Sequence, residues 1–175
     1  MQKSKPTILA NLATSFEVLY KTANLVPDDK FNISVQNKWT TAENISHLLT
    51  ATKMTLLPFT LPKFVPALLY GKSNGKSRTY DELVAAYESK LASGAKATGA
   101  YVPKKTNYNP NKLAKQILNE GEKLVTAIDT KWTEEQLDTY RVAHPILGKL
   151  TMRELAYFTI YHNIHHTETI RKYYL

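Results

Sequence analysis

Cysteine is absent from this sequence of 175 residues. Its absence excludes disulfide bonds, thiolate zinc sites, iron–sulfur clusters and a cysteine nucleophile supplied by the protein itself. Long apolar runs are missing too, since no stretch reaches the ~18 apolar residues that a transmembrane helix requires. The polar start, Met1 to Lys5, continues directly into an amphipathic segment, which predicts that there is no signal peptide. We therefore expect a cytoplasmic protein with no membrane partner.

Acidic residues are few relative to basic ones, with 15 Asp and Glu against 23 Lys and Arg and a formal net charge of +8. The lysines are scattered, and their densest group, between Lys104 and Lys115, is interrupted by asparagine and proline. No known nucleic-acid-binding motif accompanies them. A solvated basic surface is therefore the preferred interpretation. A nucleic-acid partner is not expected, and a basic binding protein is the last of three functional hypotheses.

Composition is otherwise typical of a globular protein, with 43% hydrophobic and 22% charged residues, which excludes disorder and collagen-like structure. The length corresponds to a single domain over residues 1–175. Helical periodicity dominates. Apolar residues recur at three- and four-residue spacing from Ile8 to Ala23 and predict a first helix that Pro27 ends.

Helix starts are marked by capping residues. Thr40 with Glu43 forms a capping box for a second helix. Further starts are predicted at Thr79, Asn109-Pro110, Thr133 and Thr151. Between the second helix and the next, Pro58, Pro62 and Pro66 argue against one continuous helix and for a bent, packed excursion.

Strand signals are weak. Residues 32–36 alternate briefly, and residues 140–147 could be extended around Pro145, but we expect neither to supply a sheet. Four principal helices with one or two short extra helices predict an all-α four-helix bundle. We expect the second helix to lie beside the last.

Three of the five histidines, His162, His165 and His166, crowd into the last predicted helix. His162 and His166 are one turn apart, with an angular offset of about 40°, so both imidazoles can approach one metal ion. His47, on the second predicted helix, could be presented toward the same point. Three neutral nitrogen ligands with an open position suit zinc, nickel, iron or a similar ion. The alternative is a hydrogen-bonded core His47 and a solvated histidine cluster.

The remaining histidines and the tryptophans have more than one interpretation. His165 could be a rival ligand, a second-shell partner, a proton shuttle or a polar surface residue, and we predict the second-shell role. His144 precedes Pro145 and is expected to be a turn residue, although it could overhang the site. Trp39 and Trp132 are predicted to be core residues.

Two segments resemble the DinB-like superfamily of four-helix bundles. Trp39 to Leu48 is similar to the family segment in which tryptophan and Ser/Thr precede a histidine inside the second helix. The run from His162 to His166 resembles the family's His-x-x-His-His pattern in the last helix, and the order and separation of the two segments also fit. The resemblance implies that His47, His162 and His166 form a triad on a divalent metal ion. Thr167 to Thr169 stand where many relatives have Arg-Gly-Gln, so that guanidinium and amide have no counterpart here.

The resemblance also implies a function. Some relatives transfer low-molecular-weight thiols onto electrophiles or isomerise substrates with the help of a thiol. We therefore expect a metal-dependent enzyme, with zinc or nickel favoured over iron or manganese, that carries out thiol-dependent transferase or hydrolase-like chemistry on a small molecule. The nucleophile would arrive with the cosubstrate. The alternative is a non-catalytic metal-binding or stress-associated helical bundle, and a homodimer is left open.

Overall fold

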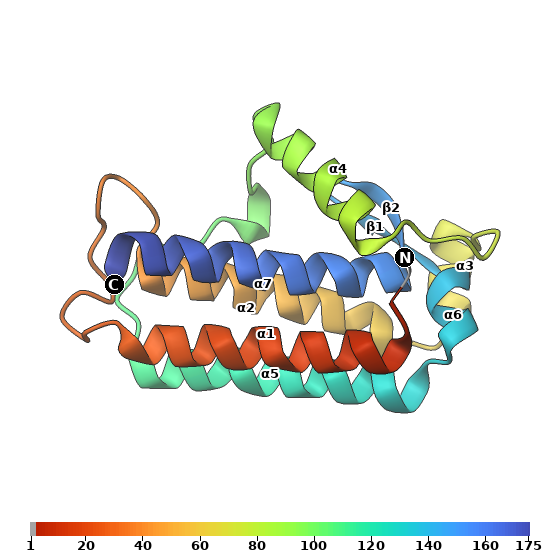
Figure 1. Ribbon diagram of the computed structural model, residues 1–175, viewed down its shortest axis with the longest axis horizontal. Coiled ribbons are helices and arrows are strands. Elements are labelled where there is room, and N and C mark those ends of the chain that lie inside the picture. Colours follow the sequence, from red (N-terminus) through yellow and green to blue (C-terminus); the bar gives the residue numbers. More distant parts are fainter. Residues whose placement is uncertain (1–2) are drawn as a thin grey trace.

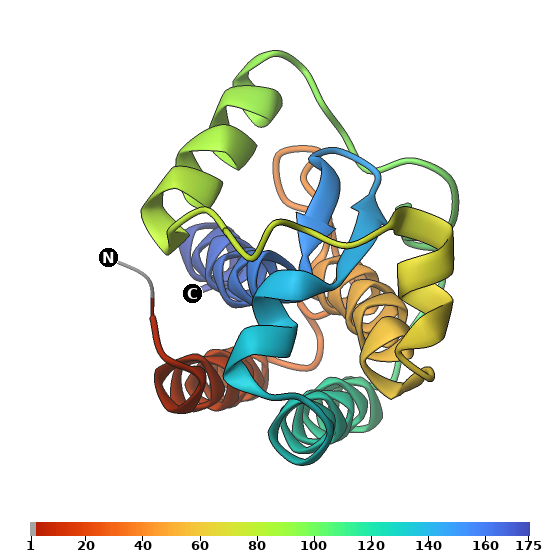
Figure 2. The same cartoon turned by 90° about the vertical axis from the view of Figure 1, so that its right-hand side faces the viewer.

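Four long helices lie side by side in the computed structural model of the protein, which describes residues 3–175 (Figure 1). They are α1 (Lys5–Leu25), α2 (Thr41–Thr60), α5 (Pro110–Lys131) and α7 (Met152–Tyr174). α1 and α2 each contact both α5 and α7, so the four helices form a ring of neighbours, which Figure 2 shows end-on. The expected all-α bundle is confirmed, as is the position of α2 beside α7.

Local capping chemistry sets the helix starts. Reciprocal capping boxes begin α2, α4 (Tyr80–Ala92), α6 (Glu134–Thr139) and α7. The side chain of Asn109 accepts a hydrogen bond from the Lys112 amide at the start of α5. All of the predicted starts are thus confirmed, and a further one at Ser4 begins α1. These caps satisfy amides that the first turn of a helix leaves without partners.

A long connection covers one side of the bundle. α2 and α5 are neighbours that run in the same direction (Figure 1), so the chain must return along the bundle between them. The returning segment, residues 61–109, contains α3 (Phe64–Tyr70), α4 and the 3-10 helix η1 (Gly99–Tyr101). α4 packs on α7 and η1 packs on α2 (Figure 2). This connection therefore covers the face where α2 meets α7.

The proline-rich stretch interrupts the helix, as predicted, but later than its first proline. α2 continues through Pro58 to Thr60, and the chain bends at residues 61–63 before α3 begins. Pro58 lies in the last turn of α2, where the lost amide hydrogen bond disturbs little of the helix beyond it. The result is a short helix folded back beside the bundle.

The structure contains a small sheet, so the expectation that the weak strand signals supply no sheet is wrong. β1 (Arg141–His144) pairs antiparallel with β2 (Gly148–Thr151), and Gly148 takes a φ of 73° that closes the turn between them. The pairing buries Val142 and Leu150 together, a tertiary gain that single-strand alternation does not reveal. Residues 32–36 form no strand, and the chain turns at Gln36 and Asn37, which both take positive φ.

The core lies between the four long helices. Trp132 is buried and its indole Nε1 donates to the carbonyl of Phe59 over 2.9 Å, so the predicted core position of this tryptophan is confirmed. No helix within residues 3–175 has the length and apolar character needed to cross a membrane.

The packing of α1 on α5 leaves no room for a side chain at Gly121. A Cβ atom at this position would lie inside the van der Waals distance of the Phe16 ring. We expect Gly121→Ala to lower the free energy of unfolding, because overpacking costs about 1–3 kcal/mol and outweighs the gain in helix propensity of up to about 1 kcal/mol. Urea unfolding measures the change. In a Phe16→Ala background, which removes the ring atoms that the new Cβ would meet, the same substitution should cost less, and equal costs in both backgrounds would contradict the steric account.

Candidate metal centre

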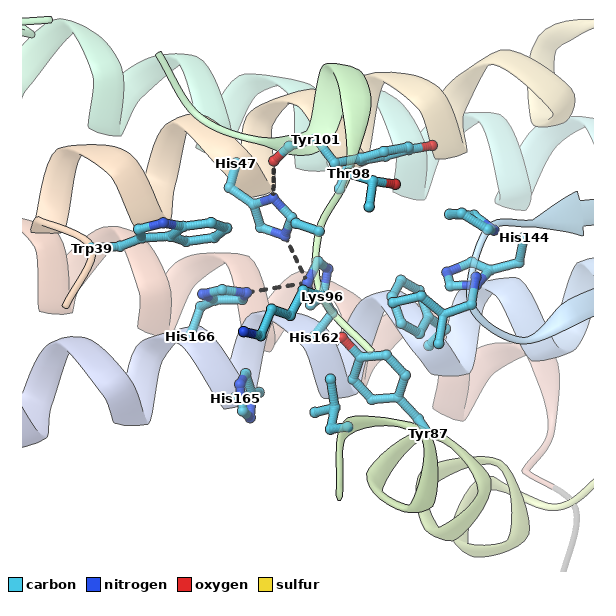
Figure 3. Close-up of a pocket in the computed structure, with 16 residues that line it drawn as sticks. Trp39, His47, Tyr87, Lys96, Thr98, Tyr101, His144, His162, His165 and His166 are labelled. Atoms are coloured by element: carbon cyan, nitrogen blue, oxygen red, sulfur yellow. Dashed lines mark hydrogen bonds between the residues drawn. The ribbon is translucent and has the colours of Figure 1, made fainter. Parts of the chain in front are cut away.

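Three buried histidines meet between α2 and α7. His47 Nε2 lies 3.0 Å from His162 Nε2, which lies 3.2 Å from His166 Nε2. One nitrogen from each residue falls within 4.8 Å of the other two, so the group could hold a metal ion. The predicted convergence of the three nitrogens is therefore present. Figure 3 shows the three rings turned toward one another.

Helix packing explains this convergence. His162 and His166 are four residues apart on α7, so one turn of helix places both on the face that meets α2. His47 lies in the second turn of α2 and faces α7 across the contact between the two helices. Because α2 and α7 are neighbours over this length, the third nitrogen arrives opposite the pair.

Hydrogen bonds on the outer nitrogens settle the tautomers of two rings. His47 Nδ1 lies 2.6 Å from the Tyr101 carbonyl oxygen, which can only accept, so Nδ1 carries the proton. His166 Nδ1 lies 2.7 Å from Asn44 Oδ1. The Asn44 amide nitrogen donates to the carbonyls of Trp39 and Thr40, which fixes its oxygen as the atom facing His166. Both Nε2 atoms therefore present lone pairs.

These lone pairs fit a cation. The neutral ring of His162 carries one proton. With that proton on Nε2, at most one of the two Nε2 contacts is a hydrogen bond, and with it on Nδ1 both contacts bring lone pairs together. A shared cation would relieve that repulsion. Nitrogens bound at ~2.0–2.1 Å to one tetrahedral zinc ion lie about 3.3 Å apart, close to the separations found here.

Burial also keeps the rings neutral. It lowers the pKa of His162 and of His166 well below the usual histidine value, and the neighbouring histidines lower both further. Burial lowers the pKa of His47 too, although its hydrogen bond to the Tyr101 carbonyl opposes this. Neutral imidazole is the form that binds metal, so no proton needs to be displaced near neutral pH.

A cavity of about 150 Å³ opens beside the three nitrogens. Trp39 forms one wall: its ring stacks on His166 with centroids 6.1 Å apart and lies 5.1 Å from His47. Phe158 lies against His162 at 4.8 Å. The expectation that Trp39 fills the core is wrong, because the residue precedes α2 and is half-buried against the histidines.

His165 and His144 both line this cavity without joining the cluster of nitrogens. His165 is half-buried, with its ring perpendicular to that of His166 and 5.2 Å away. His47 and His166 are oriented by hydrogen bonds that they donate to the Tyr101 carbonyl and to Asn44 Oδ1, and the second-shell role of His165 stays a prediction. His144 Nδ1 accepts from the amides of Ile146 and Leu147, so it is a turn residue that also faces the cavity.

Several site residues escaped the sequence analysis. Asn44 precedes His47 by three residues and so shares its helix face, a signal that could have identified it. Tyr101 acts through its backbone carbonyl, which no side-chain pattern reveals. Tyr87 directs its hydroxyl toward the histidines from α4, and Lys96 extends over them from the loop after α4 (Figure 3).

Comparison with known families agrees with this geometry. The family model of the DinB superfamily matches residues 11–170, which is most of the chain. The protein belongs to the DinB superfamily. Neither the curated proteins nor the solved structures give a match. The DinB resemblance in the two histidine segments thus extends over all four bundle helices, and the triad that it implies coincides with the three clustered histidines.

We expect His144 to make the stability of this DinB protein depend on pH. Burial lowers its pKa to about 4, whereas the unfolded chain titrates near 6.5, so protons bind the unfolded state first as the pH falls. The contribution of His144 to stability is complete above about pH 6.5 and is lost toward pH 4. We expect metal-free His144→Asn, whose amide oxygen can still accept from the turn, to lose less stability than the wild type between about pH 7 and pH 5. Urea unfolding at both pH values measures this, and equal losses would contradict it.

Proposed function

We propose that this protein is a divalent-metal-dependent enzyme that acts on a small molecule, with His47, His162 and His166 as the metal ligands. The observation that carries the proposal is the convergence of three buried Nε2 atoms, at least two of them with free lone pairs, on the wall of an open cavity. The hydrogen bonds that His47 donates to the Tyr101 carbonyl and His166 donates to Asn44 Oδ1 support the ligating orientation of two of the rings.

The donor set favours particular metals. Three neutral imidazoles without a carboxylate suit zinc or nickel, with iron or manganese as alternatives, and suit magnesium or calcium poorly because these prefer oxygen ligands. Three imidazole ligands do not restrict the site to a redox-active metal.

The open cavity supports an enzyme over a non-catalytic metal-binding bundle. Structural zinc sites are usually closed by four protein ligands, whereas catalytic sites have three and leave a position for water or substrate. Here the described residues supply a cluster of three, and the cavity lies against all of them. A small molecule could therefore approach the nitrogens directly.

The bound ion would supply Lewis acidity, which lowers the pKa of a thiol or water and polarises a substrate oxygen. The chain has no cysteine, so a thiol nucleophile would come from a cosubstrate, consistent with a thiol-dependent transferase. Trp39 and Phe158 exclude water from two sides of the histidines. Burial raises the pKa of Tyr87, so its hydroxyl stays protonated and can donate a hydrogen bond to a substrate oxygen.

Metal content tests the ligand assignment. We expect His162→Ala and His166→Ala each to abolish tight metal binding, because two remaining imidazoles seldom hold a divalent ion against buffer. His165→Ala, the matched control on the same helix, should keep the ion and weaken its binding by at most about 10–100-fold. The measurement is metal stoichiometry of untagged protein after identical dialysis.

Two results would contradict this assignment. Loss of metal from His165→Ala with retention in His166→Ala would exchange their roles. Equal retention in all three variants, or no metal in the wild type after incubation with zinc or nickel, would remove the proposed site.

The hydrogen bond from His166 to Asn44 should strengthen metal binding. We expect Asn44→Leu to weaken metal binding by about 10–100-fold, because His166 loses the acceptor that orients its ring. Asn163→Leu is the matched control, since this buried asparagine bonds Ser15 on α1 instead of a histidine. Competition titration with a chromophoric chelator measures both affinities, and similar losses in the two variants would show that the effect comes from general destabilisation.

A further inference from the structure

A second cavity adjoins the histidine cavity. It has a volume of about 260 Å³ and lies between α2, α3 and the β hairpin. The two cavities share five lining residues: Ala51, Tyr101, His144, Pro145 and Phe158. They are therefore adjacent chambers that meet at these side chains. Figure 3 shows the Tyr101 ring directed from His47 toward the His144 side, where the chambers meet.

The walls of the second chamber are mostly apolar. Met54 and Leu57 of α2, Val65 and Leu69 of α3 and Leu155 of α7 contribute to the lining. No lysine, arginine, aspartate or glutamate is among the residues that line it. An alkyl chain would leave water there without burying an unpaired charge, which is the condition for favourable transfer.

The first chamber differs from the second in having one cationic side chain among its lining residues. Lys96 is the one lysine or arginine among its lining residues, and no carboxylate lines it. The Lys96 side chain extends over the cluster beside His165 and His166 (Figure 3). The two adjacent chambers therefore offer a cationic side chain, the three histidine nitrogens next to it, and an apolar region beyond Tyr101.

Size supports a ligand that uses both chambers. Binding sites for drug-sized molecules usually measure about 300–1,000 Å³. The histidine chamber alone is smaller than this, whereas the two chambers together reach the lower part of that range.

We propose that the substrate is an amphiphilic small molecule with an anionic group near Lys96 and the histidines and a linear apolar tail in the second chamber. This inference rests on the proposed function, because the ligand is a substrate only if the protein is an enzyme. Binding of an apolar tail in the second chamber does not itself depend on a metal. Tyr101 connects the two parts, because its carbonyl orients His47 and its ring lines both chambers.

Chain-length dependence is the test. Butanoate, hexanoate and octanoate are titrated calorimetrically into the metal-free protein and into protein loaded with zinc. We expect affinity to rise by about three- to fourfold per methylene as the tail fills the chamber. Octylamine should bind more weakly than octanoate, because its ammonium group faces Lys96.

Variants on one helix locate the tail. Val65→Trp fills the second chamber and should remove the gain from hexanoate to octanoate. Leu68→Trp is the matched control, because Leu68 is 83% exposed and does not line the chamber.

A variant of the cationic residue tests the other end of the ligand. Lys96→Gln should weaken the binding of every carboxylate by a similar factor and leave the gain in affinity per methylene unchanged. Circular dichroism checks folding, and Leu69→Asp with Leu68→Asp replaces the tryptophan pair if Val65→Trp does not fold.

The outcomes separate this inference from the metal proposal. A chain-length gradient that Val65→Trp abolishes and Leu68→Trp preserves supports the tail chamber, with or without metal binding. Equal affinities for the three carboxylates, or equal losses in both tryptophan variants, would overturn it even if the histidines bind zinc. Equal binding of octanoate and octylamine would overturn the anionic end.

Discussion

The contact between α2 and α7 at the three histidines is the interaction on which the rest of this structure depends. Burying imidazoles inside a helical bundle is unfavourable unless their polar atoms find partners. The outer nitrogens of His47 and His166 have partners in Tyr101 and Asn44, while the inner nitrogens face one another. The protein thus satisfies one side of the cluster and leaves the other side suited to a cation.

The parallel arrangement of α2 and α5 gives this cluster its cavity. Parallel neighbours cannot be joined by a short turn, so the chain between them must travel back along the bundle. That connection brings the Tyr101 carbonyl to His47 and places Tyr87 and Lys96 over the same face. Without it, the histidines would lie at an open groove between two helices. Topology therefore supplies the walls of the chamber, while the bundle supplies the nitrogens.

Ion pairs at the start of α7 hold the histidine helix in position. Arg153 is buried, and its guanidinium contacts Asp138 and Glu134 at 2.6 Å each. Glu154 pairs with Arg78 at 3.0 Å and also closes the capping box of α7. These contacts tie α7 to α6 and to the connection before α4. Because they limit rotation of α7 about its axis, they also keep His162 and His166 directed at α2.

Local sequence determined the helix starts and the pairing of His162 with His166, because capping boxes and one-turn spacing depend on residues only three or four positions apart. It also identified His47 through its similarity to a known family. Tertiary structure alone decided the position of Trp39, the β hairpin and the carbonyl that holds His47. These depend on contacts between distant segments, such as the 54 residues that separate His47 from Tyr101, and no local pattern encodes them. The second chamber also depends on tertiary structure alone, since α2, α3 and α7 form it only after they have packed.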